Sequence, residues 1–146
     1  MILDKTGNLF DTHCYCIVHG CNAQGVMGSG VALQIKQNYS EAYTAYKRIS
    51  NTNGLSVGDC LFVNSNDKLI INAITQEFYG RDKVVYVSYR GIANSMHRIK
   101  NYLDKHNITE IAMPRIGAGL GGGDWSIIET IIKQELTDIS VYVYTL

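Results

Sequence analysis

Apolar residues in this chain of 146 residues form short continuous runs and longer stretches with helical spacing. Short runs without alternation are typical of strands that are covered on both faces. The sequence predicts strands at residues 1–5, 15–18, 60–63, 69–73, 111–113 and 141–144. Helical spacing predicts helices at residues 31–37, 40–49 and 89–106, and a last helix that Asp124 caps and whose core face carries Ile127, Ile128, Ile131 and Ile132.

The predicted strands and helices interleave along the chain, except for one pair of consecutive strands. A tight polar turn joins residues 60–63 to residues 69–73, which predicts a hairpin. The order therefore predicts an α/β fold of three layers, in which helices cover both faces of a mixed, mostly parallel sheet. The length suits a single domain that spans residues 1–146. Residues 75–87 are less regular and predict a surface loop.

The charge and hydropathy of the chain narrow the classes of partner. The formal net charge is zero, so we expect no long nucleic acid as partner, although a local basic patch stays open. There is no apolar run long enough to cross a membrane, and the N-terminus lacks the plan of a signal peptide. We therefore expect a cytoplasmic monomer without a membrane partner.

The four cysteines are predicted to be reduced and buried. Strand alternation would place Cys14 and Cys16 on the same face. The run from His13 to Cys21 also permits a zinc site, but the sequence offers no second pair of ligands of the kind that structural zinc sites use. We expect buried apolar packing here, and neither a metal nor a cofactor.

Two glycine-rich segments, residues 20–32 and 117–123, each follow a predicted strand. Glycine lets a ligand approach the backbone closely, and a loop that opens a helix presents free N–H groups to an anion. The pattern predicts two walls around one polyphosphate ligand. Known nucleotide motifs fit poorly, since the first segment lacks the lysine of a P-loop and has Leu33 where the dinucleotide fingerprint needs a glycine.

Residues 17–32, 113–120 and 141–146 together resemble the macro domain family. The similarity covers nearly the whole chain and is greatest to the small branch of ADP-ribose 1″-phosphate phosphatases and terminal ADP-ribose glycohydrolases. It implies a three-layer fold that binds ADP-ribose or ADP-ribose 1″-phosphate at the top of the sheet, and hydrolysis of the latter to ADP-ribose and phosphate. The alternatives are a hydrolase that removes ADP-ribose from protein or nucleic acid, and a binding module without activity.

The resemblance also implies roles for single residues. Asn8 matches the acidic residue that accepts a hydrogen bond from the adenine amine, with an ordinary turn residue as the alternative. Asn22 matches the asparagine that contacts the distal ribose, with a loop-tying role as the alternative. The implied ligand-binding residues are Asn8, Leu9, Asn22, Gly25, Val26, Met27, Gly28, Ser29, Gly30, Val31, Arg115, Ile116, Gly117, Ala118, Gly119, Leu120 and Gly121.

The catalytic residues follow less directly from the resemblance. The glycohydrolase branch uses a lysine and an aspartate where this chain has Gln76 and Gly121, so we expect no covalent lysine–sugar intermediate. The catalytic candidates are His19 as acid or base, Asn22, and Asp124 as a carboxylate. His19 packed under the loop is an equal alternative, and helix capping is the preferred role of Asp124.

Overall fold

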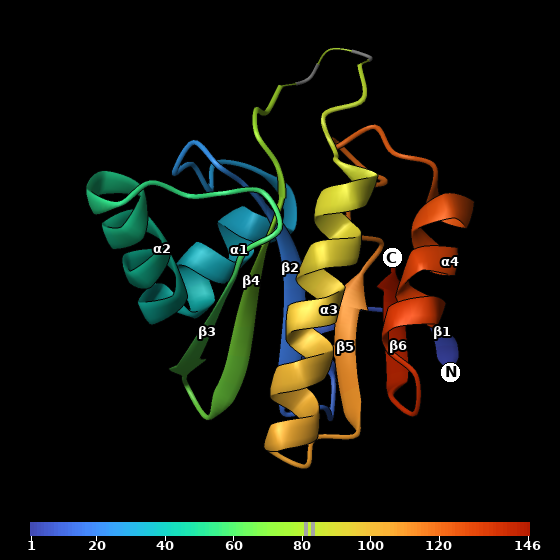
Figure 1. Cartoon of the computed structure of the whole chain (residues 1–146). Coiled ribbons are helices and arrows are strands. Elements are labelled where there is room, and N and C mark those ends of the chain that lie inside the picture. Colours follow the sequence, from blue (N-terminus) through green and yellow to red (C-terminus); the bar gives the residue numbers. More distant parts are fainter. Residues whose placement is uncertain (81, 83) are drawn as a thin grey trace.

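Six strands lie in one sheet, in the order β1-β6-β5-β2-β4-β3, in the computed structural model, which describes residues 1–80, 82 and 84–146 (Figure 1). β3 and β4 pair antiparallel and form the predicted hairpin, and the other neighbouring strands pair parallel. The prediction of a mixed, mostly parallel sheet is therefore confirmed. The strands are β1 (Ile2–Thr6), β2 (Cys16–Asn22), β3 (Cys60–Ser65), β4 (Lys68–Gln76), β5 (Glu110–Pro114) and β6 (Ser140–Thr145).

Helices cover both faces of this sheet, which confirms the three predicted layers (Figure 1). Alternate residues of β2 belong to different cores. Cys16 and Val18 pack toward α3 and α4, whereas Ile17 packs toward α1 and α2. The helices are α1 (Gly30–Asn38), α2 (Ser40–Thr52), α3 (Tyr89–Lys105) and α4 (Trp125–Glu135), and a short 3-10 helix, η1 (Leu9–Asp11), precedes β2.

Some local predictions were wrong in detail. β2 continues past Val18 to Asn22, because β4 pairs with it along that whole length. Ser40 is the first residue of α2 and Tyr39 is its N-cap, without a capping side chain. Ile128 is buried in the α4 core, whereas Ile127 is 44% exposed.

The cysteines differ from the expectation in their orientation. Cys14 lies before β2, not on it, and packs with Leu9 and Ile35, while Cys16 packs on the opposite face of the sheet. The two therefore do not share a face. All four cysteines belong to the described part of the chain and are free thiols.

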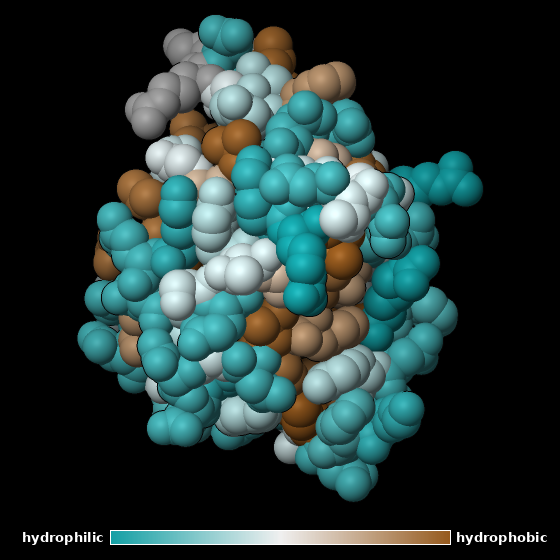
Figure 2. Space-filling view, turned by 90° about the vertical axis from the view of Figure 1, so that its left-hand side faces the viewer, coloured by the Kyte–Doolittle hydropathy of each residue, from teal (hydrophilic) through white to brown (hydrophobic). Residues whose placement is uncertain are grey.

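Figure 2 shows the molecule from the side on which α2 and β3 lie in Figure 1. Hydrophilic residues cover most of this view, and a hydrophobic band crosses it. β3 is an edge strand, and its residues from Cys60 to Val63 are half-buried. Across the residues that the structure describes, none of the helices has the length and apolar character of a membrane span.

Two neighbouring isoleucines of α4 test this packing. Ile128→Ala is expected to lower the free energy of unfolding by about 2–5 kcal/mol, since it removes a fully buried side chain. Ile127→Ala should change it by less than about 0.5 kcal/mol, because that side chain is partly in solvent. Urea unfolding measures both, and equal effects would contradict the placement of α4.

Candidate functional site

Both glycine-rich segments lie at the same end of the sheet. We call residues 23–29, which follow β2, the first loop, and residues 115–123, which follow β5, the second loop. β2 and β5 are parallel neighbours, so their carboxyl ends meet at one edge. The approach is close, since a Cβ added to Gly20 at the end of β2 would lie 3.1 Å from Ile116 Cγ2. The structure thus brings together the two segments that the sequence singled out.

The first loop is tied down by Asn22 and Tyr46. Asn22 Oδ1 accepts the N–H of Gln24 at 2.9 Å, and its Nδ2 donates to the carbonyl of Val26 at 2.8 Å. The Tyr46 hydroxyl lies 2.7 Å from the Asn22 carbonyl oxygen and accepts the N–H of Val26 at 3.1 Å. Burial raises the pKa of Tyr46, so the phenol stays protonated. Asn22 therefore has the loop-tying role, and its contact with a ribose stays a prediction.

The end of the first loop and the first residue of α1 present free backbone donors. The N–H groups of Gly28, Ser29 and Gly30 have no hydrogen-bond acceptor among the residues that the structure describes. Ser29 is the N-cap of α1, and its side chain makes no capping hydrogen bond. Unpaired N–H groups at the positive end of a helix dipole favour an anion. The loop can therefore bind phosphate without a charged side chain.

The second loop is a series of tight turns with free donors of its own. Gly123 N–H donates to the Gly117 carbonyl at 2.8 Å, and Gly117 has a φ of 78°, which an L side chain rarely adopts. Within the described residues, the N–H groups of Gly119, Leu120 and Gly121 have no acceptor. The second loop thus offers a second row of donors beside the first loop.

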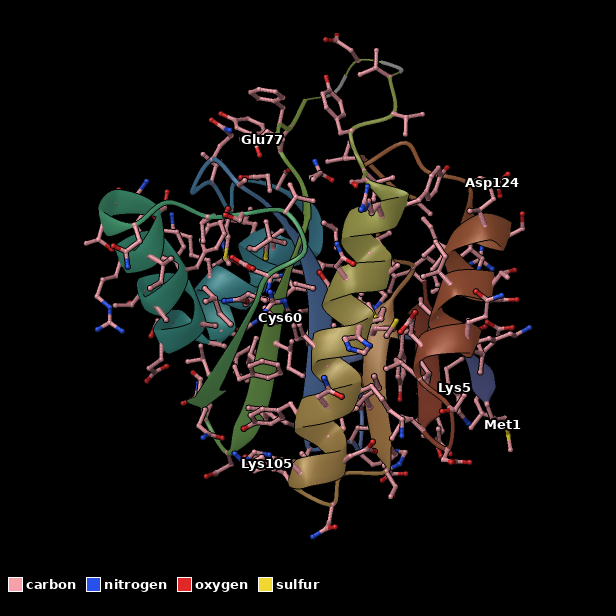
Figure 3. The ribbon with its side chains drawn as sticks, viewed as in Figure 1. Met1, Lys5, Cys60, Glu77, Lys105 and Asp124 are labelled. Carbon is pink, nitrogen blue, oxygen red and sulfur yellow. The ribbon has the colours of Figure 1, made fainter. Side chains whose placement is uncertain are left out.

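Asp124 follows the second loop and caps α4. Its Oδ1 accepts the N–H of Ser126 at 2.9 Å and the hydroxyl of the same residue at 2.7 Å. These hydrogen bonds lower the pKa of the Asp124 carboxyl. Figure 3 shows Asp124 at the start of α4, away from the first loop. The preferred interpretation of Asp124 as a capping residue is confirmed. Arg115, at the start of the second loop, places its guanidinium carbon over the ring of Trp125, the first residue of α4, at 5.8 Å from the ring centroid.

His19 lies inside the molecule, between the sheet and α2. It is 1% exposed, and its Nε2 lies 2.6 Å from Asn72 Oδ1. Asn72 Nδ2 donates to the Ala42 carbonyl at 3.0 Å, which orients the amide so that His19 Nε2–H is the donor to Oδ1. Burial lowers the pKa of His19 to about 4. A neutral, enclosed imidazole favours the packing alternative for His19 over a role in proton transfer.

The segment after β1 also shows local roles. Asn8 is exposed and caps η1, since its side chain accepts the N–H of Phe10 at 2.9 Å. Leu9 is 5% exposed and packs with Cys14 and Ile17 in the core between the sheet and α1. The turn alternative therefore describes what Asn8 does in this structure, and its contact with adenine stays a prediction.

Two polar residues beside the first loop were not among the predicted site residues, although the sequence analysis compared Gln76 with the lysine of the glycohydrolase branch. Gln76 ends β4 opposite Asn22, and its Nε2 donates to the Phe78 carbonyl at 2.6 Å. The carbonyl of Glu77 accepts the N–H of Ala23 at 3.2 Å, and the Glu77 carboxylate lies 3.3 Å from Gln24 Nε2. Figure 3 shows Glu77 just beyond the end of β4. The signal in the sequence that could have identified Gln76 and Glu77 as site residues is a polar pair shortly after an apolar run.

The predicted surface loop begins after β4. Phe78 and Tyr79 are 62% and 54% exposed, so neither side chain packs into the core. Val87 returns to the sheet end, where it forms a bridge with Gln76, and its N–H donates to the Gly121 carbonyl at 3.0 Å. Within this loop, Arg81 and Lys83 lie outside the described residues.

Comparison with known proteins agrees with this arrangement. The sequence profile of the Macro domain matches residues 18–132. A DNA ADP-ribosyl glycohydrolase of Mycobacterium tuberculosis is 30% identical over 99% of this chain and 42% of its own length. An ADP-ribose 1″-phosphate phosphatase of Saccharomyces cerevisiae is 26% identical over 96% of each chain. The solved macrodomain of Mycobacterium tuberculosis DarG is 28% identical, covers 100% of this chain and 98% of its own, and has a TM-score of 0.85.

The fold and the paired loops define a macrodomain. The match extends over most of the chain, so this protein belongs to the Macro domain family. It spans less than half the length of the glycohydrolase that it resembles.

The buried His19 predicts a pH dependence of stability. The unfolded chain takes up this proton near the ordinary histidine pKa of 6.5, but the folded chain does so only at about 4. The neutral His19 therefore contributes fully to the free energy of unfolding above pH 6.5. That free energy falls by about 3 kcal/mol as the pH drops from 6.5 to about 4. Urea unfolding measures the loss. His19→Gln should flatten the profile, whereas His106→Gln, at an exposed position, should not.

Two glycines of the second loop form a matched pair. A Cβ at Gly121 would lie 2.7 Å from the Gly117 carbonyl oxygen, whereas one at Gly119 meets nothing within 4 Å. Gly121→Ala should therefore destabilise the fold by about 1–3 kcal/mol, as forced insertions into packed sites do. Gly119→Ala should stay within about 0.5 kcal/mol of the parent protein in thermal unfolding. A parent-like Gly121→Ala protein would contradict the described turn.

Proposed function

We propose that this chain binds ADP-ribose between the first and second loops and hydrolyses ADP-ribose 1″-phosphate to ADP-ribose and phosphate. The observation that carries the proposal is the pair of unpaired N–H rows, at residues 28–30 and 119–121, on the ends of two neighbouring parallel strands. The names of the relatives support the ligand, because both the glycohydrolase and the phosphatase act on ADP-ribose derivatives.

The ligand's charge supports this division of the site. A diphosphate needs several hydrogen-bond donors, and backbone N–H groups provide them at fixed positions. The first loop and the start of α1 would hold the distal ribose and one phosphate, with Asn22 orienting that ribose. The second loop would hold the diphosphate from the other side, and Asn8 would accept the adenine amine. A chain with no net charge suits a small anion held by the backbone.

Position 76 favours phosphate release over the lysine-dependent reaction. Gln76 has an amide, which is not a nucleophile, at the place where the glycohydrolase branch uses a lysine. In the proposed step, water attacks the phosphorus of the 1″-phosphate, the bond from phosphorus to the 1″ oxygen breaks, and that oxygen takes up a proton. Backbone donors aimed at the phosphate would stabilise the charge that develops.

Glu77 is the candidate for the residue that activates the water. Its carboxylate contacts Gln24 of the first loop, and the residue directly follows Gln76. His19 is enclosed and neutral, and the Asp124 carboxylate is engaged at the start of α4. These two catalytic candidates would therefore act through structure, His19 by holding α2 and Asp124 by setting the direction in which the second loop ends.

A phosphate-release assay tests the proposal. ADP-ribose should raise the melting temperature in a concentration-dependent way, and ADP-ribose 1″-phosphate should release inorganic phosphate. Glu77→Gln should lower kcat about 100-fold or more, the usual contribution of a general base, and should leave the ADP-ribose-induced shift unchanged. Glu129→Gln, which removes a carboxylate on α4, is the matched control.

The second candidate function is removal of ADP-ribose from DNA or protein. The name of the 30% identical relative favours it. An ADP-ribosylated DNA oligonucleotide and an ADP-ribosylated protein should be assayed beside the phosphate ester. Binding of ADP-ribose without phosphate release would reject the phosphatase proposal, and release from either macromolecule would then establish the alternative. Binding with no turnover of any substrate would leave a binding module.

A further inference from the structure

A cluster of three different metal-ligand side chains lies at the other end of the sheet. His13, Cys14 and Glu110 each bring one donor atom, and the three donor atoms all lie within 4.8 Å of one another. Glu110 is the first residue of β5, and the two others lie just before β2. β5 begins at the lower end in Figure 1, opposite the first and second loops. The cluster is therefore separate from the candidate ADP-ribose site.

The distances within the cluster suit one tetrahedral ion. His13 Nε2 lies 3.3 Å from Glu110 Oε1 and 3.9 Å from Cys14 Sγ. Around zinc, with bonds of about 2.0–2.3 Å at tetrahedral angles, neighbouring donors lie about 3.3–3.8 Å apart. Small side-chain rotations would therefore bring all three donors to one ion, with the fourth position left to water.

The chemistry of the donors selects the class of ion. Thiolate, imidazole and carboxylate together suit a borderline-soft divalent ion such as Zn²⁺, whereas Mg²⁺ and Ca²⁺ prefer oxygen ligands throughout. His13 and Glu110 have 57% and 44% exposed side chains, so an ion can approach from solvent on their side of the buried thiol.

Neighbouring groups hold the cluster in place. The Cys14 N–H donates to Thr12 Oγ1 at 3.2 Å. The His13 ring makes a T-shaped contact with the ring of Tyr142, with 5.0 Å between the ring centroids. Lys68 Nζ donates to the carbonyls of Thr12 and Cys14, so this ammonium group is held by the backbone on either side of His13. The backbone before β2 is thus fixed before any ion arrives.

We propose that His13, Cys14 and Glu110 form a binding site for Zn²⁺ that ties the segment before β2 to the start of β5. The thiol gives up its proton on binding, so each ion bound releases one proton to the buffer, and no electron is transferred. The distance from the first and second loops gives this ion a stabilising role and leaves the proposed hydrolysis to water and the protein's own groups.

Metal titration of the purified, chelator-treated chain tests the proposal. Calorimetry should show one Zn²⁺ per chain, and Co²⁺ should produce the near-ultraviolet absorption of a thiolate-to-cobalt charge transfer. His13→Gln and Glu110→Gln, both at the surface, should each weaken Zn²⁺ binding about 100-fold or more, since even a partner outside the ligand set is worth about 10–100-fold. Zn²⁺ should raise the melting temperature of the parent protein but not of these variants.

The controls separate this site from other thiols and histidines. Cys60→Ser and His106→Gln remove a free thiol and an exposed imidazole elsewhere, and should bind Zn²⁺ as the parent does. Cys14→Ser should abolish the cobalt absorption if it folds, and the two surface variants decide the question if it does not. Unchanged affinity in both surface variants, or binding of Co²⁺ without thiolate absorption, would overturn the proposal. ADP-ribose binding in the same samples reports separately on the proposed function.

Discussion

The parallel pairing of β2 with both β4 and β5 is the constraint on which the site depends. Parallel strands end at the same edge, so three chain segments that are far apart in sequence leave the sheet together. The first loop, the pair Gln76 and Glu77, and the second loop are those segments. β2 lies between β5 and β4 in the sheet, and glycines in the loop that follows it leave the backbone there accessible.

Buried polar side chains turn this arrangement into a defined geometry. His19 and Asn72 link two strands to a carbonyl of α2, and Tyr46 of α2 holds Asn22 and the first loop. Each of these groups has a partner, so its burial carries little penalty, whereas removal of one partner would leave the other unsatisfied. The position of α2 and the shape of the first loop are therefore coupled through a short polar chain.

The two ends of the sheet carry different chemistry. The carboxyl end presents backbone N–H groups and amide side chains, which suit a phosphate-bearing ligand. The amino end brings thiol, imidazole and carboxylate together, which suits a soft cation. The two proposed sites are compatible with a chain of zero net charge, because each would depend on local donors and not on the field of the whole molecule.

Much of the fold could be predicted from patterns among neighbouring residues of the sequence. Apolar runs, helical spacing and the two glycine-rich segments identified the strands, the layers and the two loops at the carboxyl end of the sheet, because each of these signals lies within a few neighbouring residues. Tertiary structure alone decided the roles of the polar side chains. His19 pairs with Asn72, Gln76 lies opposite Asn22, and Glu110 meets His13 across intervals that no periodicity encodes. A side chain's chemistry depends on its burial and partners, and these exist only once distant strands have paired.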